Sequence, residues 1–434
     1  MQQLFTNLRG APIDQSAGHR SELLRPLGSF EHLFWLMDQR HPAHFAVTAE
    51  VEGDVSPRDW RQALDRVQAR HPLLNASIEG AVRRVPYYRR EQSAPIPLRI
   101  VEDDDPASRW KVEVGEELAM PFDPEQAPLA RAVLVQGEWQ VALILVAHPS
   151  IADGMSLAFA IRDTLQAIAG ATLEELSVPS SQDEILENMQ VQNKNLGNDA
   201  KPAPAGDVST IRQRNEARPK VQGFCFSETV TGQLRGRARQ ERTTVHAALL
   251  AALAIAGRRV SDAWQDIPTR LSSVVNTRRE LGIGEHCGVF VDAASTTFDP
   301  ELYDLDAIPF WSLARDAKSS VAVGETKEGI AALVSALGEA LKNCPDATEA
   351  ADFAAMTFAR EAMLTNLGAV PLADQFGSVK LKAIWGPAIL QGLVGEQTIG
   401  AATAGGKLTL THTSYTPHEG LLDEMQNVLV EACA

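Results

Sequence analysis

The feature that most restricts the fold is the apolar run at residues 141–147, VALILVA, together with the turn and helix pattern that follow it. Its residues are apolar on both faces, which is typical of a strand at the centre of a sheet that is covered on both sides. Gly154 then opens a segment with apolar residues at helical spacing, and Asp153 is well placed as its N-cap. A buried strand, a tight turn and an amphipathic helix in this order predict an α/β fold.

Strand and helix patterns also alternate through the rest of the first half. Residues 43–53 alternate between apolar and polar side chains, as a half-buried strand does. Ser56 and Pro57 suit the N-cap and first position of a helix over residues 56–72. Residues 129–147 predict a hairpin that turns near Gly137.

The second half continues this mixture. Its predicted helices cover residues 243–259, most of 312–341, and 420–433, and its predicted strands cover 222–230, 271–277, 380–386, 395–402 and 407–415. The last three strands are expected to form an antiparallel meander, in which the final two are joined at residues 403–406, TAGG.

Residues 176–220 differ in composition from both flanks, because they are rich in Ser, Asn, Asp, Pro and Gln. Such a stretch predicts a long, partly disordered linker between domains. A chain of 434 residues suits one large or two medium domains. We therefore expect an N-terminal domain over 1–175, a linker over 176–220 and a C-terminal domain over 221–434.

Several classes of protein are disfavoured by simple counts. No uninterrupted apolar run reaches about 18 residues, so no membrane span is expected. The first residues carry no charged and then apolar leader, so we expect a cytoplasmic protein. The four cysteines lack C-x-x-C spacing, which argues against a zinc site and a disulfide scaffold.

The net charge of −16 makes nucleic acid an improbable partner, because phosphate contacts supply most non-specific affinity. Basic clusters nevertheless occur at residues 82–90, 211–220 and 234–242. Runs of this kind are usually solvated surface. The alternative is a docking site for a phosphate-bearing partner such as coenzyme A or an acyl carrier protein.

Common catalytic and metal-binding motifs are absent: the sequence has no G-x-S-x-G, H-E-x-x-H or Walker loop. The glycines at 282–288, GIGEHCG, precede a strand pattern rather than a helix, so a loop is expected there. His41 and His44 lack a converging set of ligands. His246 lies in an alanine-rich segment, where an ordinary buried histidine is the default. No metal and no cofactor are predicted.

Residues 148–154, HPSIADG, resemble the H-H-x-x-x-D-G motif of the chloramphenicol-acetyltransferase-like superfamily. That superfamily includes nonribosomal peptide condensation domains and phthiocerol-type O-acyltransferases, and the latter look nearest. Further segments resemble the family in the same order along the chain, at residues 70–78, 121–135, 274–281, 365–370 and 408–425.

The resemblance implies two similar α/β domains that form a V around a central tunnel. An acyl thioester would enter the tunnel from one side and an alcohol or amine acceptor from the other. The second histidine of the motif would remove the acceptor's proton. Asp153 would be structural and would pair with Arg278 of the second domain, and Gly154 would allow a close approach at the turn.

In this sequence the motif is altered at its second histidine. Alignment on Asp153 and Gly154 places His148 at the first histidine and Pro149 at the second, and proline cannot accept a proton. His148 is the nearest catalytic candidate, although adjacent side chains leaving a strand point to opposite faces. Ser150 or His412 could serve instead, positioning alone could support catalysis, or the acyl-transfer chemistry could be lost.

The sequence thus predicts an acyltransferase or condensation-type protein of specialised metabolism. It would join an acyl thioester, carried by coenzyme A or a carrier protein, to an alcohol or amine, with Asn366 and Trp385 as further candidates for the tunnel wall. Two alternatives remain open. One is a non-catalytic scaffold that binds a carrier protein or a partner enzyme, and the other is a repurposed tunnel that carries out cyclisation or hydrolysis.

Overall fold

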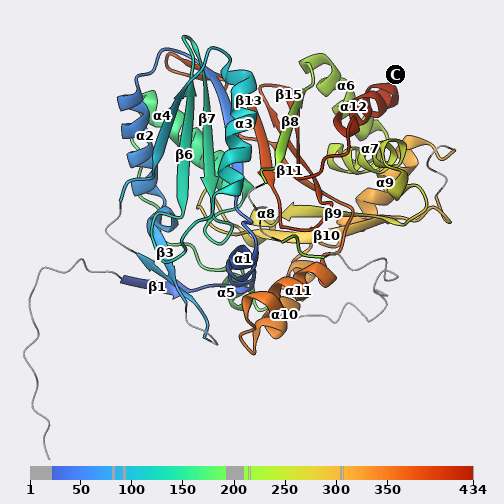
Figure 1. Cartoon of the computed structure of the whole chain (residues 1–434), viewed down its shortest axis with the longest axis horizontal. Helices are drawn as coiled ribbons and strands as arrows, with labels where there is room; N and C mark the ends of the chain where they lie inside the picture. Colours follow the sequence, from blue (N-terminus) through green and yellow to red (C-terminus); the bar gives the residue numbers. More distant parts are fainter. Residues whose placement is uncertain are drawn as a thin grey trace, which may run out of the picture.

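The computed structural model describes residues 22–80, 84–90, 94–191, 210–213, 215, 217–303, 305 and 307–433. Two six-stranded sheets lie side by side, each flanked by helices, and a smaller three-stranded sheet lies beside the first (Figure 1). The α/β prediction is therefore confirmed. Residues 192–209, within the stretch expected to be a partly disordered linker, lie outside the described residues.

The first sheet is built around β7, which pairs with β2 on one side and β6 on the other. One face of β7 packs with α2 and α4, and the other packs with α3, so the strand is buried on both faces as predicted. In sheet order the strands are β12 (Gln375–Phe376), β13 (Val379–Ile389), β2 (Phe45–Glu52), β7 (Gln140–Ala147), β6 (Ala130–Gln136) and β5 (Leu98–Glu102). The helices are α2 (Pro57–Arg70), α3 (Pro106–Ala119) and α4 (Gly154–Ile168).

Strand β13 corrects one prediction. We expected it to form a meander with the two strands that follow, but it pairs with β2 of the first sheet, where Ile384 lies opposite Ala49. Ile384 is buried on the side of α2 and α4, and Trp385 is buried on the side of α3, so β13 suits a central position. A strand from the second half thus completes the first sheet, while the proposed domain boundaries stay a prediction.

The second sheet is covered on one face by α6, α7, α9 and α12, whose apolar side chains form a continuous core with the strands. In sheet order its strands are β10 (Val291–Phe298), β9 (Thr269–Asn276), β11 (Ala362–Ala369), β14 (Gln397–Ala404), β15 (Lys407–Ser414) and β8 (Lys220–Cys225). The helices are α6 (Glu228–Gln240), α7 (Val245–Val260), α9 (Phe310–Val321) and α12 (Leu421–Cys433). The hairpin predicted between β14 and β15 is confirmed.

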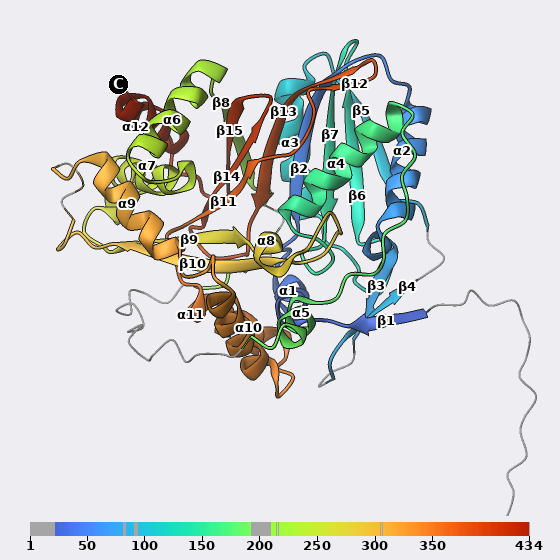
Figure 2. The same cartoon turned by 180° about the vertical axis from the view of Figure 1, so that it is seen from behind.

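A third group of helices packs together around a separate apolar cluster (Figure 2). It contains α1 (Ser29–Arg40), α5 (Gln182–Asn188), α10 (Lys327–Leu341) and α11 (Ala347–Thr357). Helix α5 lies within the stretch predicted to be a linker, yet its Leu186 is buried and its Gln182 accepts a hydrogen bond of 2.7 Å from Thr277 Oγ1. Helix α5 is therefore packed into the fold, and the linker over 176–220 stays a prediction.

The remaining elements are short. The three-stranded sheet has the order β1 (Glu22–Pro26), β4 (Tyr87–Arg90) and β3 (Ala76–Glu79). Helix α8 (Arg278–Leu281) and the 3-10 turns η1 (Pro72–Asn75) and η2 (Asp262–Trp264) complete the chain. In the part of the chain that the structure describes, no helix is both long and apolar enough to cross a membrane.

Candidate functional site

The turn after β7 places His148 inside the protein rather than in a cavity. The His148 side chain is 0% exposed. Its Nδ1 accepts a hydrogen bond of 3.1 Å from the Ser150 amide, and its Nε2 lies 3.4 Å from Asp38 Oδ2. Both ring nitrogens therefore face groups of the protein itself.

Asp38 links His148 to a second buried histidine, since His44 Nδ1 lies 3.7 Å from Asp38 Oδ1. Burial alone would raise the pKa of the Asp38 carboxyl. Hydrogen bonds and charge interactions with His148 and His44 outweigh burial and hold that pKa well below its usual range. The cluster of Asp38, His44 and His148 is thus an internal polar contact that supports the turn.

Pro149, the next residue, lines a cavity of about 90 Å³ that we call the apolar cavity. One wall comes from α1, and strands β9 and β11 contribute the hydroxyls of Ser272 and Thr365. The other polar residues of the lining are Asp153, Asp292, Arg360 and Gln391. Its lining includes Phe30, Leu33, Phe34, Met37, Phe45, Pro149, Gly154, Ser272, Val274, Met363, Thr365 and Pro387. At the position where the family motif would hold a base, the wall of the cavity is a hydrocarbon ring.

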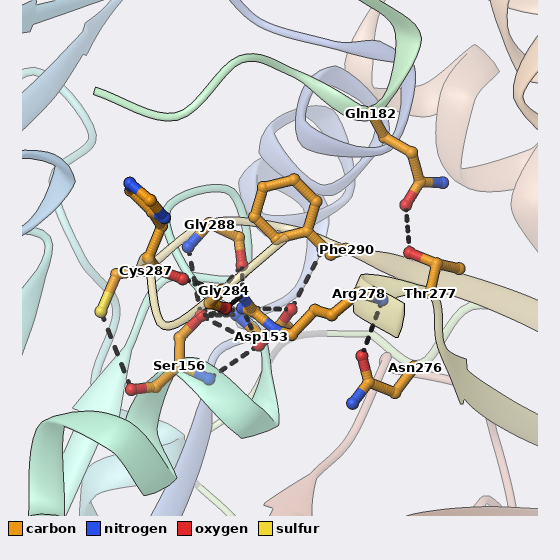
Figure 3. A network of polar contacts seen from close by, with 11 residues as sticks. Asp153, Ser156, Gln182, Asn276, Thr277, Arg278, Gly284, Cys287, Gly288 and Phe290 are labelled. Carbon is orange, nitrogen blue, oxygen red and sulfur yellow. Dashed lines mark hydrogen bonds and ion pairs between the residues drawn. The ribbon is translucent and has the colours of Figure 1, made fainter. Parts of the chain in front are cut away.

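Asp153 and Arg278 form the centre of a buried polar network (Figure 3). Arg278 Nη2 lies 2.9 Å from both carboxylate oxygens of Asp153, and the Phe290 amide donates to Asp153 Oδ2 at 3.1 Å. Asp153 also caps α4 by accepting from the Ser156 amide at 2.7 Å. The network therefore ties the turn after the first sheet's central strand to α8 and the loop before β10.

Gly154 allows two side chains to close over the start of α4. A Cβ atom on Gly154 would lie 2.7 Å from Pro387 Cγ and 2.8 Å from Leu367 Cδ2, both too close for any other residue without movement. Pro387 lines the apolar cavity, whereas Leu367 lines a second cavity. The contact of Gly154 with Pro387 and Leu367 therefore lies between the apolar cavity and the second cavity.

The second cavity, which we call the polar cavity, has a volume of about 450 Å³. Its lining includes Thr244, His246, Val274, Val275, Asn276, Arg279, Glu280, Val321, Glu325, Ile330, Asn366, Leu367 and Gly368. Val274 of β9 lines both cavities, so the two are neighbours.

His246 stands on the wall of the polar cavity, in the first turn of α7. Its Nε2 lies 3.0 Å from the Ser273 hydroxyl, and burial lowers its pKa to about 4, so the ring is neutral at neutral pH. From the sequence, His246 was expected to be an ordinary buried histidine. The packing of α7 against β9 places it on a cavity, and no local sequence motif predicts that packing.

Of the other candidates for the tunnel wall, Asn366 lines the polar cavity. Ser150, Trp385 and His412 are buried outside both cavities. The Ser150 hydroxyl donates to the Glu31 carbonyl at 2.8 Å, Trp385 packs against Trp110, and His412 Nε2 lies 2.9 Å from Gln397 Oε1.

The two histidines of the segment at 41–44 contact different partners. His41 Nε2 lies 3.3 Å from Arg212 Nη1, and His44 Nε2 lies 2.8 Å from the Glu117 carbonyl. Among the residues that the structure describes, no group of three or more His, Cys, Asp or Glu side chains is arranged to hold a metal ion.

Comparison with known proteins identifies the family of this chain. The family model of the condensation domain matches residues 33–322. Tyrocidine synthase 3 of Brevibacillus parabrevis is 28% identical over 158 residues, which cover 35% of this chain but only 2% of that protein. The chain therefore corresponds to a small part of this curated relative.

Two solved structures share the fold at low identity. The trichothecene 15-O-acetyltransferase TRI3 of Fusarium sporotrichioides has a TM-score of 0.67 at 13% identity, and the alignment covers 95% of each chain. The first condensation domain of the calcium-dependent antibiotic synthetase, in complex with a substrate analogue, has a TM-score of 0.66 at 16% identity, over 95% of this chain and 97% of that one. The family match spans most of the chain and the fold is shared throughout: this chain belongs to the condensation-domain family.

Proposed function

We propose that this protein transfers an acyl group from a thioester to an alcohol or amine, and that the apolar cavity receives the acyl group. The observation that carries this proposal is the cavity itself, which Pro149 and Gly154 share with strands β9 and β11. Its walls are mainly aliphatic and aromatic, as expected of a pocket that selects an apolar group.

The size of the apolar cavity favours short acyl chains. An apolar cavity of about 150 Å³ is large enough to hold benzene. The apolar cavity here, at about 90 Å³, is smaller than that and suits a group of only a few carbon atoms. We therefore propose acetyl to butyryl groups as the preferred donors.

Pro149 sets the expected rate. A positioned general base typically contributes about 10²–10⁴-fold, and proline supplies none of this. Correct placement of the thioester and acceptor contributes separately, so loss of the base at this position weakens catalysis without abolishing it.

A carrier protein or coenzyme A would present the thioester, and the family assignment favours the carrier protein. In the basic clusters, for which docking of such a partner was the alternative to solvated surface, several arginines form surface ion pairs. Arg90 pairs with Glu175 at 2.9 Å, Arg218 pairs with Glu116 at 2.5 Å, and Arg237 pairs with Glu241 at 3.6 Å. Docking through these clusters would have to compete with their present partners.

The test is an acyl-transfer assay with acetyl, butyryl and octanoyl donors, each presented on coenzyme A and on a carrier protein, against a panel of alcohols and amines with mass detection. Wild-type protein should prefer the two shorter donors. Met363→Ala, which enlarges the apolar cavity, should shift the preference toward octanoyl. Met425→Ala removes an equally buried methionine that does not line this cavity, so it should leave the preference unchanged.

A second candidate function rests on Pro149 alone. A chain with no base at the motif position could act as a scaffold that binds a carrier protein without chemistry. In that case no donor would be transferred, yet an acyl carrier protein would still bind in a calorimetric titration. Transfer to any acceptor above the uncatalysed rate would contradict this alternative.

A further inference from the structure

We propose that the polar cavity binds the acceptor alcohol or amine and that His246 accepts the acceptor's proton. The inference rests on the acyl transfer proposed above and assigns to His246 the task that the motif position, occupied by Pro149, cannot perform.

The ring of His246 is held in one orientation. Thr244 caps α7 by accepting from the Ala247 amide at 3.1 Å, which fixes the first helical turn. Ser273 is fully buried on β9 and holds His246 Nε2 at 3.0 Å. If Nε2–H donates to the Ser273 hydroxyl, Nδ1 keeps its lone pair, and within the described residues Nδ1 makes no hydrogen bond. This arrangement of an imidazole held by a second side chain is what a general base requires.

The lining of the polar cavity suits an acceptor with hydrogen-bonding groups. Arg279, Glu280 and Glu325 bring charges of both signs to it, and Asn276 contributes an amide. Most residues that line the apolar cavity are aliphatic or aromatic, although Asp153, Asp292 and Arg360 also reach it, so we assign the acyl chain to that cavity and the polar acceptor to the other. Val274 belongs to both linings, so the two cavities adjoin each other at this residue.

The proposed step conserves atoms and charge. The acceptor oxygen or nitrogen attacks the thioester carbonyl carbon while its proton passes to the free lone pair of His246. The tetrahedral intermediate then collapses, the carbon–sulfur bond breaks, and the leaving thiolate takes the proton from the imidazolium. The products are an ester or amide and a thiol, and His246 returns to its neutral form.

The other candidate histidines are less suited to this step. His148 faces Asp38 and the Ser150 amide, and His412 faces Gln397, so both lie outside the two cavities. Glu280 also lines the polar cavity and is the competing proton acceptor. It therefore enters the test as a separate variant.

The first experiment measures access to His246 and does not depend on acyl transfer. Diethyl pyrocarbonate reacts with accessible neutral imidazoles, and peptide mass mapping locates the product. His246 should be labelled, whereas the fully enclosed His412 should not. Absence of label on His246 in the folded protein would overturn the inference.

The second experiment compares transfer by His246→Gln, Ser273→Ala and Glu280→Gln with a matched control, His418→Gln, which alters a half-buried histidine that packs on Trp264. His246→Gln should lower kcat by about 10²-fold with little change in KM, since loss of one positioned base has this size. Ser273→Ala should lower kcat to a smaller extent, because it releases the ring without removing it. His418→Gln should match wild type.

The outcomes separate the two proposals. If wild-type protein transfers acyl groups and His246→Gln retains its rate within about threefold, the assignment of His246 is wrong and the proposed function stands. A loss of rate in Glu280→Gln but not in His246→Gln would transfer the role to the carboxylate. If wild-type protein transfers no acyl group to any acceptor, the proposed function fails, and the role of His246 as a base fails with it.

Discussion

Arg278 Nη2 lies 2.9 Å from both oxygens of the Asp153 carboxylate, although the two residues are on different halves of the chain. Arg278 is 4% exposed and Asp153 is 7% exposed, so water contributes little to stabilising either charge. The pair was expected from the resemblance of residues 148–154 and 274–281 to a known family. Its geometry connects the turn that carries Pro149 to helix α8.

Arg278→Ala should destabilise the protein by about 3–5 kcal/mol, because it leaves the Asp153 carboxylate buried without its counter-charge. Urea unfolding followed by circular dichroism would measure the change. Arg315→Ala removes an arginine from an exposed pair with Glu241 and should cost no more than about 1 kcal/mol. An equal loss of unfolding free energy from both substitutions would show that the buried pair stabilises the fold no more than an exposed pair does.

Gly154→Ala should destabilise the fold by about 1–3 kcal/mol, the usual cost of forcing an extra methyl group into a packed site. Its Cβ would lie within 3 Å of both Pro387 and Leu367. Gly232→Ala in α6 is the matched control, since nothing lies within 4 Å of its Cβ. A helix-interior Gly→Ala change of that kind should be neutral or stabilise by up to about 1 kcal/mol. In thermal unfolding, the midpoint temperature should fall for Gly154→Ala and should stay the same or rise for Gly232→Ala.

In a His246→Gln background, Pro149→His should raise the rate of acyl transfer, up to a ceiling of about 10⁴-fold for one positioned base. The substitution places an imidazole on the wall of the apolar cavity, next to the retained turn of Asp153 and Gly154. Pro149→Gln, which adds a polar side chain without a base, is the control. An equal gain with Gln would point to a change in turn geometry rather than to proton transfer.

His148→Ala should affect stability rather than chemistry. It removes one of the two histidines beside Asp38, so the buried Asp38 carboxylate keeps only His44 as a histidine partner. This loss should lower the free energy of unfolding by about 1–3 kcal/mol. The folded variant should keep the wild-type transfer rate per active molecule. Complete loss of turnover in a variant that remains folded would instead make His148 the base.

Buried neutral histidines should make the protein less stable in mild acid. Burial, with a smaller contribution from His418, lowers the pKa of His412 to about 4, whereas an unfolded histidine titrates near 6.5. Between these values the unfolded state binds more protons, so stability falls as the pH is lowered from about 6.5 to about 4. The slope for one such group is at most about 1.4 kcal/mol per pH unit.

His412→Gln should remove that contribution, and the free energy of unfolding should depend less steeply on pH between 6.5 and 4. Urea unfolding at several pH values within and above this range would show the difference. An unchanged slope in the variant would mean that His412 is already protonated in the folded protein.

The sequence predicted most of the first sheet, because β7 has apolar residues on both faces and α4 begins at a clear N-cap, Asp153. It did not place β13, since a short apolar strand shows how deeply it is buried but not which edge it pairs with. For the same reason His246 could not be recognised. Its proposed role depends on Ser273, which is distant in the sequence, and an alanine-rich helix carries no sign of a cavity beside it.

The pairing of β13 with β2 has a consequence for how the chain is made. Val51 is matched with Leu381, so the first sheet cannot be complete until the segment around Leu381 has left the ribosome. Until then β2 presents an unpaired edge that other nascent chains could extend. An N-terminal fragment ending in the segment 176–220 should accordingly aggregate when expressed alone and recover when a peptide spanning β12 and β13 is supplied in trans.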